Sequence, residues 1–173
     1  MLASQENASN NLTAQITLVL YLMDRDTTDM SRQEMEEPFN ICRQLIESSP
    51  GYWQSELAKL YLVFEPSYTG DTNQQLLLIQ DALSAVDFDL LDKTDNEVLN
   101  AMKQIYTQGE DSSWKDVLLV IRANALCEED RLIEAEEVVK SITSEKHRKL
   151  MQDRVALGKK MRAQRNKIDP SPK

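Results

Sequence analysis

The sequence is poor both in residues that break regular structure and in residues that commonly carry out chemistry. Of its 173 residues only four are glycine and five are proline, which disfavours long loops and all-β folds. No stretch approaches the roughly 20 apolar residues needed to span a membrane. No basic segment followed by an apolar run marks a secretory signal. We therefore expect a helical protein of the cytosol or nucleus with no membrane partner.

Histidine and cysteine are too scarce for the usual catalytic or metal sites. His147 is the only histidine, and because it lies between Lys146 and Arg148 we interpret it as a solvated surface residue. Zinc sites need several His or Cys ligands, and general acid–base catalysis often uses histidine. Cys42 and Cys127 lie in apolar, helical surroundings and are interpreted as small core residues rather than a disulfide framework.

Motifs that bind phosphates or metals are also missing. The sequence contains neither GxxxxGK[ST] nor GxGxxG, so no phosphate-binding loop is encoded. It has no Glu-x-x-His pair for a di-metal bundle and no EF-hand loop. The acid-rich stretches at 34–37 and 128–137 fall on the polar faces of predicted helices. We expect no catalytic residues, no metal and no cofactor.

What the chain does contain is apolar residues at helical spacing almost throughout. This periodicity predicts an all-α fold, a compact bundle of about eight antiparallel helices joined by short turns. A polar stretch at 1–9 is expected to be disordered, residues 10–157 to form the helical domain, and 158–173 to form a basic helix end and tail. The predicted helices lie at about 10–24, 32–48, 52–64, 72–86, 95–108, 114–127, 131–142 and 145–157.

Several helix starts carry capping signals. Ser31–Glu34 and Thr94–Glu97 match the capping box, in which a hydroxyl and a carboxylate satisfy exposed backbone N–H groups. Ser112 or Ser113, and later Ser144, are expected to cap the sixth and eighth helices. Pro38 should kink the second helix or restart it near Glu37, because proline fits only the first turn of a helix.

The first helix is apolar nearly all round. Leu12, Ile16, Val19, Leu20 and Met23 follow one face, while Leu18, Tyr21 and Leu22 add apolar surface elsewhere. A helix of this kind must be covered on most sides. Two arrangements provide that cover: a second copy of the protein, or the chain's own domain wrapped around a central helix.

Two further regions are candidate binding surfaces. Leu60, Tyr61, Phe64 and Tyr68 flank the loop 65–71 and either edge a groove for a short peptide or pack as an ordinary loop. The other region is the basic C-terminal part. Ten of the 20 basic residues but only two of the 29 acidic ones lie at 146–173, which leaves a net charge near −17 before Lys146. Lys159, Lys160, Arg162 and Arg165 are candidate phosphate contacts, the alternative being a solvated helix end.

The sixth and seventh helices resemble a single tetratricopeptide-type hairpin. Ala123, Ala125 and Ala135 place small residues where the two helices must approach closely. No 34-residue recurrence of the full repeat signature is present, so an open repeat array is not expected.

Three segments carry a recognisable pattern: Ile16–Met23, Phe39–Ile46 and the run of small, apolar and acidic residues Val120–Val139. Together they resemble the homology domain of telomere repeat-binding factors (TRFH), an all-helical homodimerisation fold. The resemblance implies a homodimer built from the first two helices and a late helix, here with Leu12, Ile16, Val19, Leu20, Met23, Phe39 and Ile46 in the interface. It also implies peptide docking near 60–71.

The resemblance further implies a biological setting. The chain would be the dimerisation and scaffold domain of a nuclear, chromosome-associated protein at telomeres. Its partners would be a second copy and other telomere-associated proteins that carry short peptide motifs, while a Myb-type domain not present in this chain would read DNA. The alternative hypothesis is a monomeric tetratricopeptide-like adaptor that binds a partner peptide or helix.

Overall fold

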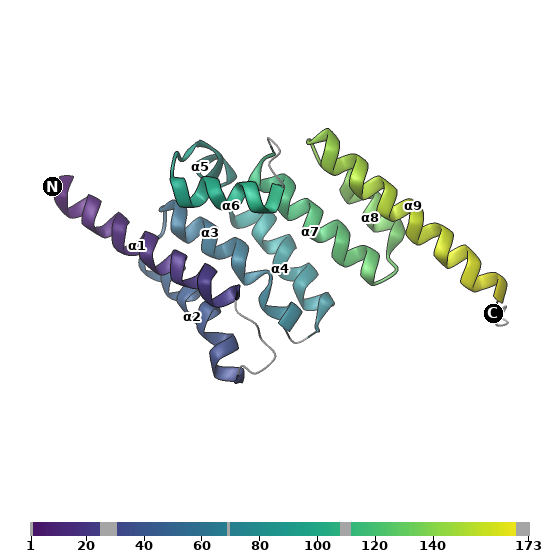
Figure 1. The fold of residues 1–173 in the computed structure, drawn as a ribbon, viewed down its shortest axis with the longest axis horizontal. Helices are drawn as coiled ribbons and strands as arrows, with labels where there is room; N and C mark the ends of the chain where they lie inside the picture. Colours follow the sequence, from purple (N-terminus) through teal and green to yellow (C-terminus); the bar gives the residue numbers. More distant parts are fainter. Residues whose placement is uncertain (1, 25–30, 69, 108–111, 169–173) are drawn as a thin grey trace. The chain divides into compact units, whose positions relative to one another are not determined.

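The structure, a computed structural model, describes residues 2–24, 31–68, 70–107 and 112–168, and the side chains within 11–24, 31, 33–66, 70–104 and 112–165. The secondary structure of these residues is entirely helical (Figure 1). The elements are α1 (Leu2–Met23), α2 (Arg32–Ser48), α3 (Trp53–Leu62), the 3-10 helix η1 (Glu65–Tyr68), α4 (Thr72–Ala85), α5 (Phe88–Lys93), α6 (Glu97–Thr107), α7 (Trp114–Glu128), α8 (Leu132–Lys140) and α9 (Glu145–Ile168).

The all-α prediction is confirmed, with differences in where the helices lie. Helix α1 begins at Leu2 rather than near residue 10, and α9 continues to Ile168, beyond the expected end at 157. Helix α5 lies between the helices predicted at 72–86 and 95–108, and its first turn is capped by the Asp87 side chain accepting from the Leu90 N–H at 2.9 Å. Six residues are too few for a helical period to be visible in the sequence.

Helix caps agree with the sequence at some ends and differ at others. Ser31 and Glu34 form the expected capping box, and Ser113 rather than Ser112 caps α7. At α6 the cap is Asn96, whose side-chain oxygen accepts from the Val98 N–H at 3.0 Å. The hydroxyl of Thr94, the expected cap, instead donates to the Leu90 carbonyl at 2.7 Å.

The expected break at Pro38 is not present as a helix end, because α2 continues through this residue. A proline lacks the N–H that would donate to the carbonyl four residues earlier. Here that carbonyl belongs to Glu34, in the first turn of the helix. The loss therefore affects one hydrogen bond close to the capping box, and the helix persists.

The chain divides into two compact units, residues 1–102 (unit 1) and 103–173 (unit 2), with α6 crossing the boundary. In unit 1, α3 packs against α1, α2, α4 and α5. Its buried residues include Leu57, Ala58 and Tyr61, and the Tyr61 hydroxyl donates to the Met102 sulfur at 3.3 Å. The core of this unit thus lies around α3.

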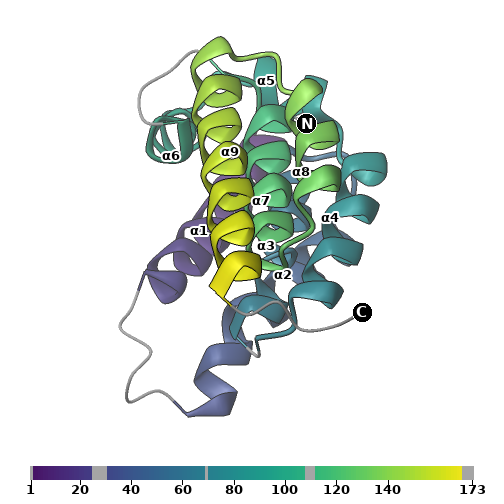
Figure 2. The same cartoon turned by 90° about the vertical axis from the view of Figure 1, so that its right-hand side faces the viewer.

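Unit 2 contains the end of α6 and the helices α7, α8 and α9. Helix α9 packs against both α7 and α8, and Figure 2 shows it in front of the other two. The three predicted small residues, Ala123, Ala125 and Ala135, are buried. No helix in the described part of the chain is long and apolar enough to cross a membrane.

Candidate functional site

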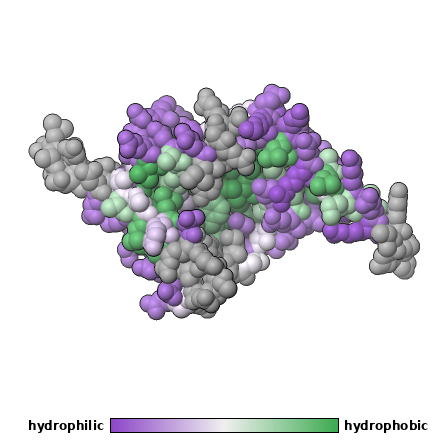
Figure 3. Space-filling view, in the orientation of Figure 1, coloured by the Kyte–Doolittle hydropathy of each residue, from purple (hydrophilic) through white to green (hydrophobic). Residues whose placement is uncertain are grey.

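The outer face of α1 carries exposed apolar side chains. Ile16 and Val19 are fully buried, whereas Leu18 is 44 % exposed and Tyr21 is 67 % exposed. Ala14 is also exposed, and the spacing 14, 18, 21 puts the three residues on one stripe of the helix, opposite the buried face. In the space-filling view, hydrophobic side chains reach the surface of unit 1 among hydrophilic ones (Figure 3).

The residues predicted for the dimer interface lie mostly inside the chain. Four are buried, namely Leu12, Ile16, Val19 and Phe39. Three are half-buried, namely Leu20, Met23 and Ile46. The face of α1 that looked richest in apolar residues is therefore covered by unit 1 itself. Among the described side chains of α1, Ala14, Leu18 and Tyr21 are the apolar ones that are exposed.

The predicted peptide-docking residues do not gather at the surface. Leu60 and Tyr61 are buried, and Phe64 is half-buried with its ring centroid 6.4 Å from that of Tyr61. The side chain of Tyr68 lies outside the described residues. Leu60 and Tyr61 thus belong to the core, so that only Phe64 of the described docking residues has a partly open side chain.

The basic residues of α9 fall into two groups. Arg154, Lys159 and Arg162 form ion pairs with acids of α7, α8 and the turn between them: Glu128 at 3.2 Å, Glu136 at 2.7 Å and Asp130 at 3.5 Å. Lys149, Lys160 and Arg165 are exposed, and none forms an ion pair among the described residues. Of the predicted phosphate contacts, Lys159 and Arg162 are therefore neutralised, while Lys160 and Arg165 have no ion pair with any residue that the structure describes.

Helix α9 also leaves large apolar side chains open. Leu150 is 52 % exposed, Leu157 is 58 % exposed and Met161 is 47 % exposed. Leu150 and Leu157 lie within the helix predicted at 145–157, but nothing in the sequence pattern separates an outer from an inner face of that helix. The buried residues Met151 and Val155 lie on the inner face, which packs on α7 and α8.

The prediction that His147 is a solvated surface residue is wrong. Its side chain is 5 % exposed, and its Nδ1 lies 2.9 Å from the hydroxyl oxygen of Ser112, which is also buried. The neighbouring cations Lys146 and Arg148 suggested a polar surface. The spacing of His147 four residues before Met151 and eight before Val155 was the signal that it shares their inner face.

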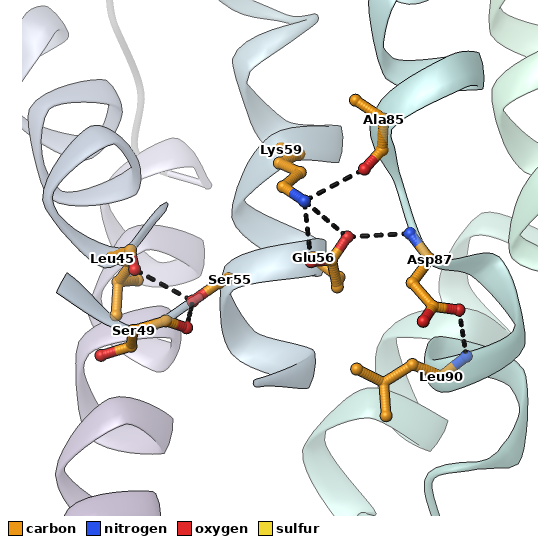
Figure 4. Close-up of polar contacts among 8 residues, drawn as sticks. All are labelled: Leu45, Ser49, Ser55, Glu56, Lys59, Ala85, Asp87 and Leu90. Atoms are coloured by element: carbon orange, nitrogen blue, oxygen red, sulfur yellow. Dashed lines mark hydrogen bonds and ion pairs between the residues drawn. The ribbon is translucent and has the colours of Figure 1, made fainter. Parts of the chain in front are cut away.

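Buried polar residues join the helices of unit 1 (Figure 4). In unit 1 the Glu56 carboxylate accepts from the Lys59 ammonium at 2.7 and 2.8 Å and from the Asp87 N–H at 2.8 Å. Lys59 also donates to the Ala85 carbonyl at 3.0 Å, and the buried Ser55 hydroxyl donates to the Leu45 carbonyl at 2.9 Å. These bonds connect α3 to the segment between α4 and α5 and to the end of α2, which is a structural role.

The described residues offer little to a metal ion or to a covalent reaction. They contain no group of three or more His, Cys, Asp or Glu side chains placed to hold a metal. Cys42 is buried, as predicted, and burial raises its thiol pKa from the usual 9.0 to about 12. Cys127 is half-buried, and burial raises its thiol pKa as well. Both thiols therefore stay protonated and poorly nucleophilic at neutral pH.

One shallow pocket in unit 2 lies between α8 and α9. Its volume is ≈ 190 Å³, and its walls combine valines with charged side chains that include Glu136 and Lys159. Those two side chains already pair with each other. The pocket lacks a group of converging polar side chains of the kind that orients a small ligand. The open apolar faces of α1 and α9 are the stronger candidates for function.

Comparisons with known proteins returned no relative: no family model matches the chain, and neither the curated proteins nor the solved structures contain a match.

Proposed function

We propose that this chain is a non-catalytic helical scaffold that forms a homodimer through the outer face of α1. The observation that carries the proposal is the exposure of Leu18 and Tyr21 on the side of α1 opposite its buried face. Tyrosine is enriched among the residues that contribute most to binding at protein interfaces. Burial of these apolar side chains against another surface removes them from water and so stabilises the resulting complex.

The charge of this region favours a second copy as the partner. The chain carries a net charge of −9, yet residues 11–23 of α1 contain no charged side chain. Two copies can therefore meet along α1 without bringing like charges together, and the cores of interfaces are depleted in charge. A two-fold dimer uses the same patch on both copies, so one stripe of Ala14, Leu18 and Tyr21 is sufficient.

For the biological setting we propose the one that the family resemblance implies. The scaffold would belong to a telomere repeat-binding protein of the nucleus, with DNA read by a Myb-type domain elsewhere. Joining two such modules raises the effective concentration of the second one once the first is bound, so weak single contacts become a stable bivalent complex. This setting rests on the sequence resemblance in Ile16–Met23, Phe39–Ile46 and Val120–Val139.

The test is solution mass by light scattering during size exclusion, over a tenfold range of concentration. We expect a mass near twice 19.8 kDa for the natural sequence. Tyr21→Glu and Leu18→Glu should give monomers with unchanged helix content, because both side chains are exposed and neither supports the core. Leu77→Glu is the matched control, since Leu77 is an equally exposed residue on α4 of the same unit and should leave the dimer intact.

Two results would contradict the proposal. A monomeric mass at every concentration would rule out the proposed homodimer and favour the monomeric tetratricopeptide-like adaptor. A dimer that survives both α1 substitutions would place the interface elsewhere. A charge at Val19 would not test the interface, because Val19 is fully buried and a glutamate there would detach α1 from its own unit.

A further inference from the structure

Helix α9 carries a line of three exposed apolar side chains on its outer side. Leu150, Leu157 and Met161 are separated by seven and four residues, which places them on one line along a helix. From first to last they span eleven residues, or about 16 Å at 1.5 Å per residue. Met151, on the face packed against α7 and α8, is turned about 100° from Leu150. The stripe is therefore separate from the surface that α9 uses within unit 2.

Positive charge without a partner accompanies the stripe. Between Glu145 and Arg165, α9 contains eight basic residues and two acidic ones. The cations Arg154, Lys159 and Arg162 are paired with acids of the α7–α8 hairpin. Lys149, Lys160 and Arg165 remain exposed, without an ion pair in the described part of the chain. The exposed surface of α9 therefore combines a line of apolar side chains with cations that form no ion pair in the described part of the chain.

We propose that α9 binds an amphipathic helix of acidic character, with its apolar face on Leu150, Leu157 and Met161. A helix of three to four turns matches the length of the stripe, and apolar anchors spaced three, four and seven residues apart are the usual way such helices bind. Carboxylates beside those anchors would meet Lys149, Lys160 and Arg165. This complementarity steers the encounter and fixes the orientation of the bound helix.

Two other classes of partner fit the same residues less well. A nucleic acid needs concentrated cations but gains nothing from three exposed aliphatic side chains. A membrane-bound amphipathic helix needs a wide apolar face, whereas here three apolar residues form a narrow line and Asp153 lies close to it. The inference does not depend on dimerisation, since α1 and α9 belong to different units.

The experiment is fluorescence anisotropy with a labelled synthetic peptide of about 16 residues, four helical turns, with leucine at positions i, i+3, i+4 and i+7 and glutamate at most others. A peptide of the same composition in scrambled order is the control for charge. We expect the ordered peptide to bind and the scrambled one to bind at least about tenfold more weakly. Raising the salt concentration should weaken binding of the ordered peptide without abolishing it, because the apolar contacts are not screened.

Variants of the protein locate the site. Leu157→Glu should weaken binding about tenfold or more, whereas Ile133→Glu, at an exposed apolar position on α8, should leave it unchanged. Lys160→Glu should also weaken binding, and Tyr21→Glu should not. Circular dichroism checks that each variant keeps its helix content. If Tyr21→Glu abolishes dimerisation but not peptide binding, the two proposals succeed separately.

Three results would overturn the inference. Equal affinity for the ordered and scrambled peptides would mean that binding depends on the net charge of the peptide and not on an apolar helical face. Unchanged affinity of the Leu157→Glu variant for the peptide would mean that the apolar line on α9 is not part of the binding site. Binding to vesicles containing one third phosphatidylserine, or to a DNA duplex, with no binding of the ordered peptide would assign α9 to a membrane or to nucleic acid instead.

Discussion

Asp116 and Thr143 are joined by two hydrogen bonds that fix the end of the α7–α8 hairpin to α7. The Asp116 carboxylate accepts from the Thr143 N–H at 2.8 Å and from the Thr143 hydroxyl at 2.6 Å. It also accepts from the Ser144 N–H at 2.8 Å, while its side chain is only 1 % exposed. Ser144 in turn lies at the start of α9, where its hydroxyl accepts from the His147 N–H at 3.4 Å. One buried carboxylate therefore sets where α9 begins.

Removing that carboxylate should destabilise unit 2. Asp116→Ala leaves the N–H groups of Thr143 and Ser144 without their acceptor, and each unsatisfied buried donor costs about 1–3 kcal/mol. We expect the free energy of unfolding, measured by urea titration with circular dichroism, to fall by about 3 kcal/mol. Asp153→Ala, an exposed aspartate on α9, is the control and should change it little. Equal stability of the two variants would mean that water replaces the carboxylate.

Glu56 should be similarly sensitive in unit 1. Its buried carboxylate holds the Asp87 N–H and the partly buried Lys59 ammonium, so Glu56→Ala leaves both without their acceptor. Breaking a buried pair in this way costs about 3–5 kcal/mol, and the partial exposure of Lys59 places our expectation at about 3 kcal/mol. Asp89→Ala breaks the exposed pair with Lys93 and should leave the melting temperature unchanged. If the melting temperature fell equally in Glu56→Ala and Asp89→Ala, the buried carboxylate would contribute no more to stability than the exposed one, contrary to this prediction.

The sequence was sufficient to predict the helices but not the interior positions of these acids. Periodicity and caps such as Ser31 depend on residues within one or two turns, so they are readable along the chain. Glu56 is buried because its acceptor atoms meet the Asp87 N–H, 31 residues away. Asp116 is buried because of Thr143, 27 residues away. Nothing near either residue in the sequence distinguishes it from an exposed helical acid.

In the candidate site, too, the sequence alone does not show which residues are buried. The apolar character of α1 was evident, but periodicity could not decide which part its own unit covers. Ile16 and Val19 form the denser face and are buried, which leaves Leu18 and Tyr21 outside. For His147, the charged neighbours Lys146 and Arg148 indicate a surface position, whereas its spacing from Met151 indicates the inner face, where the side chain in fact lies.

The two thiols should differ in reactivity. Burial raises the pKa of Cys42 to about 12, so this thiol stays protonated in the folded protein while the unfolded thiol ionises from about 9. Its contribution to stability is therefore full below pH 9 and is lost as the pH rises from about 9 to 12. At pH 8 a disulfide reagent should label the natural protein only at Cys127, which is half-buried.

The Cys127→Ala variant tests this directly. Its remaining thiol, Cys42, should react only at urea concentrations that unfold the protein, so labelling and loss of circular dichroism should follow the same curve. The Cys42→Ala variant is the matched control and should keep the slow labelling of the natural protein. Complete labelling of native Cys127→Ala within minutes at pH 8 would show that α2 opens far more readily than its burial of Cys42 implies.

Gly158 of α9 lies close against Leu132 of α8. A Cβ atom at this position would lie 2.8 Å from a terminal methyl carbon of Leu132, which is itself buried. For Gly158→Ala we expect little net change, because the gain in helix propensity, about 1 kcal/mol, offsets a small rotation of the Leu132 side chain. Gly158→Leu instead overpacks the contact and should cost about 1–3 kcal/mol.

The control for the larger change is Ala163→Leu, at an exposed position further along the same helix. It adds a leucine to α9 without touching α8, so its unfolding curve should match that of the natural sequence. If Gly158→Leu unfolds at the same urea concentration as Ala163→Leu, α8 and α9 must be able to move apart at little cost. The neighbouring ion pair between Lys159 and Glu136 would then contribute no more to the stability of this packing than an exposed surface ion pair does.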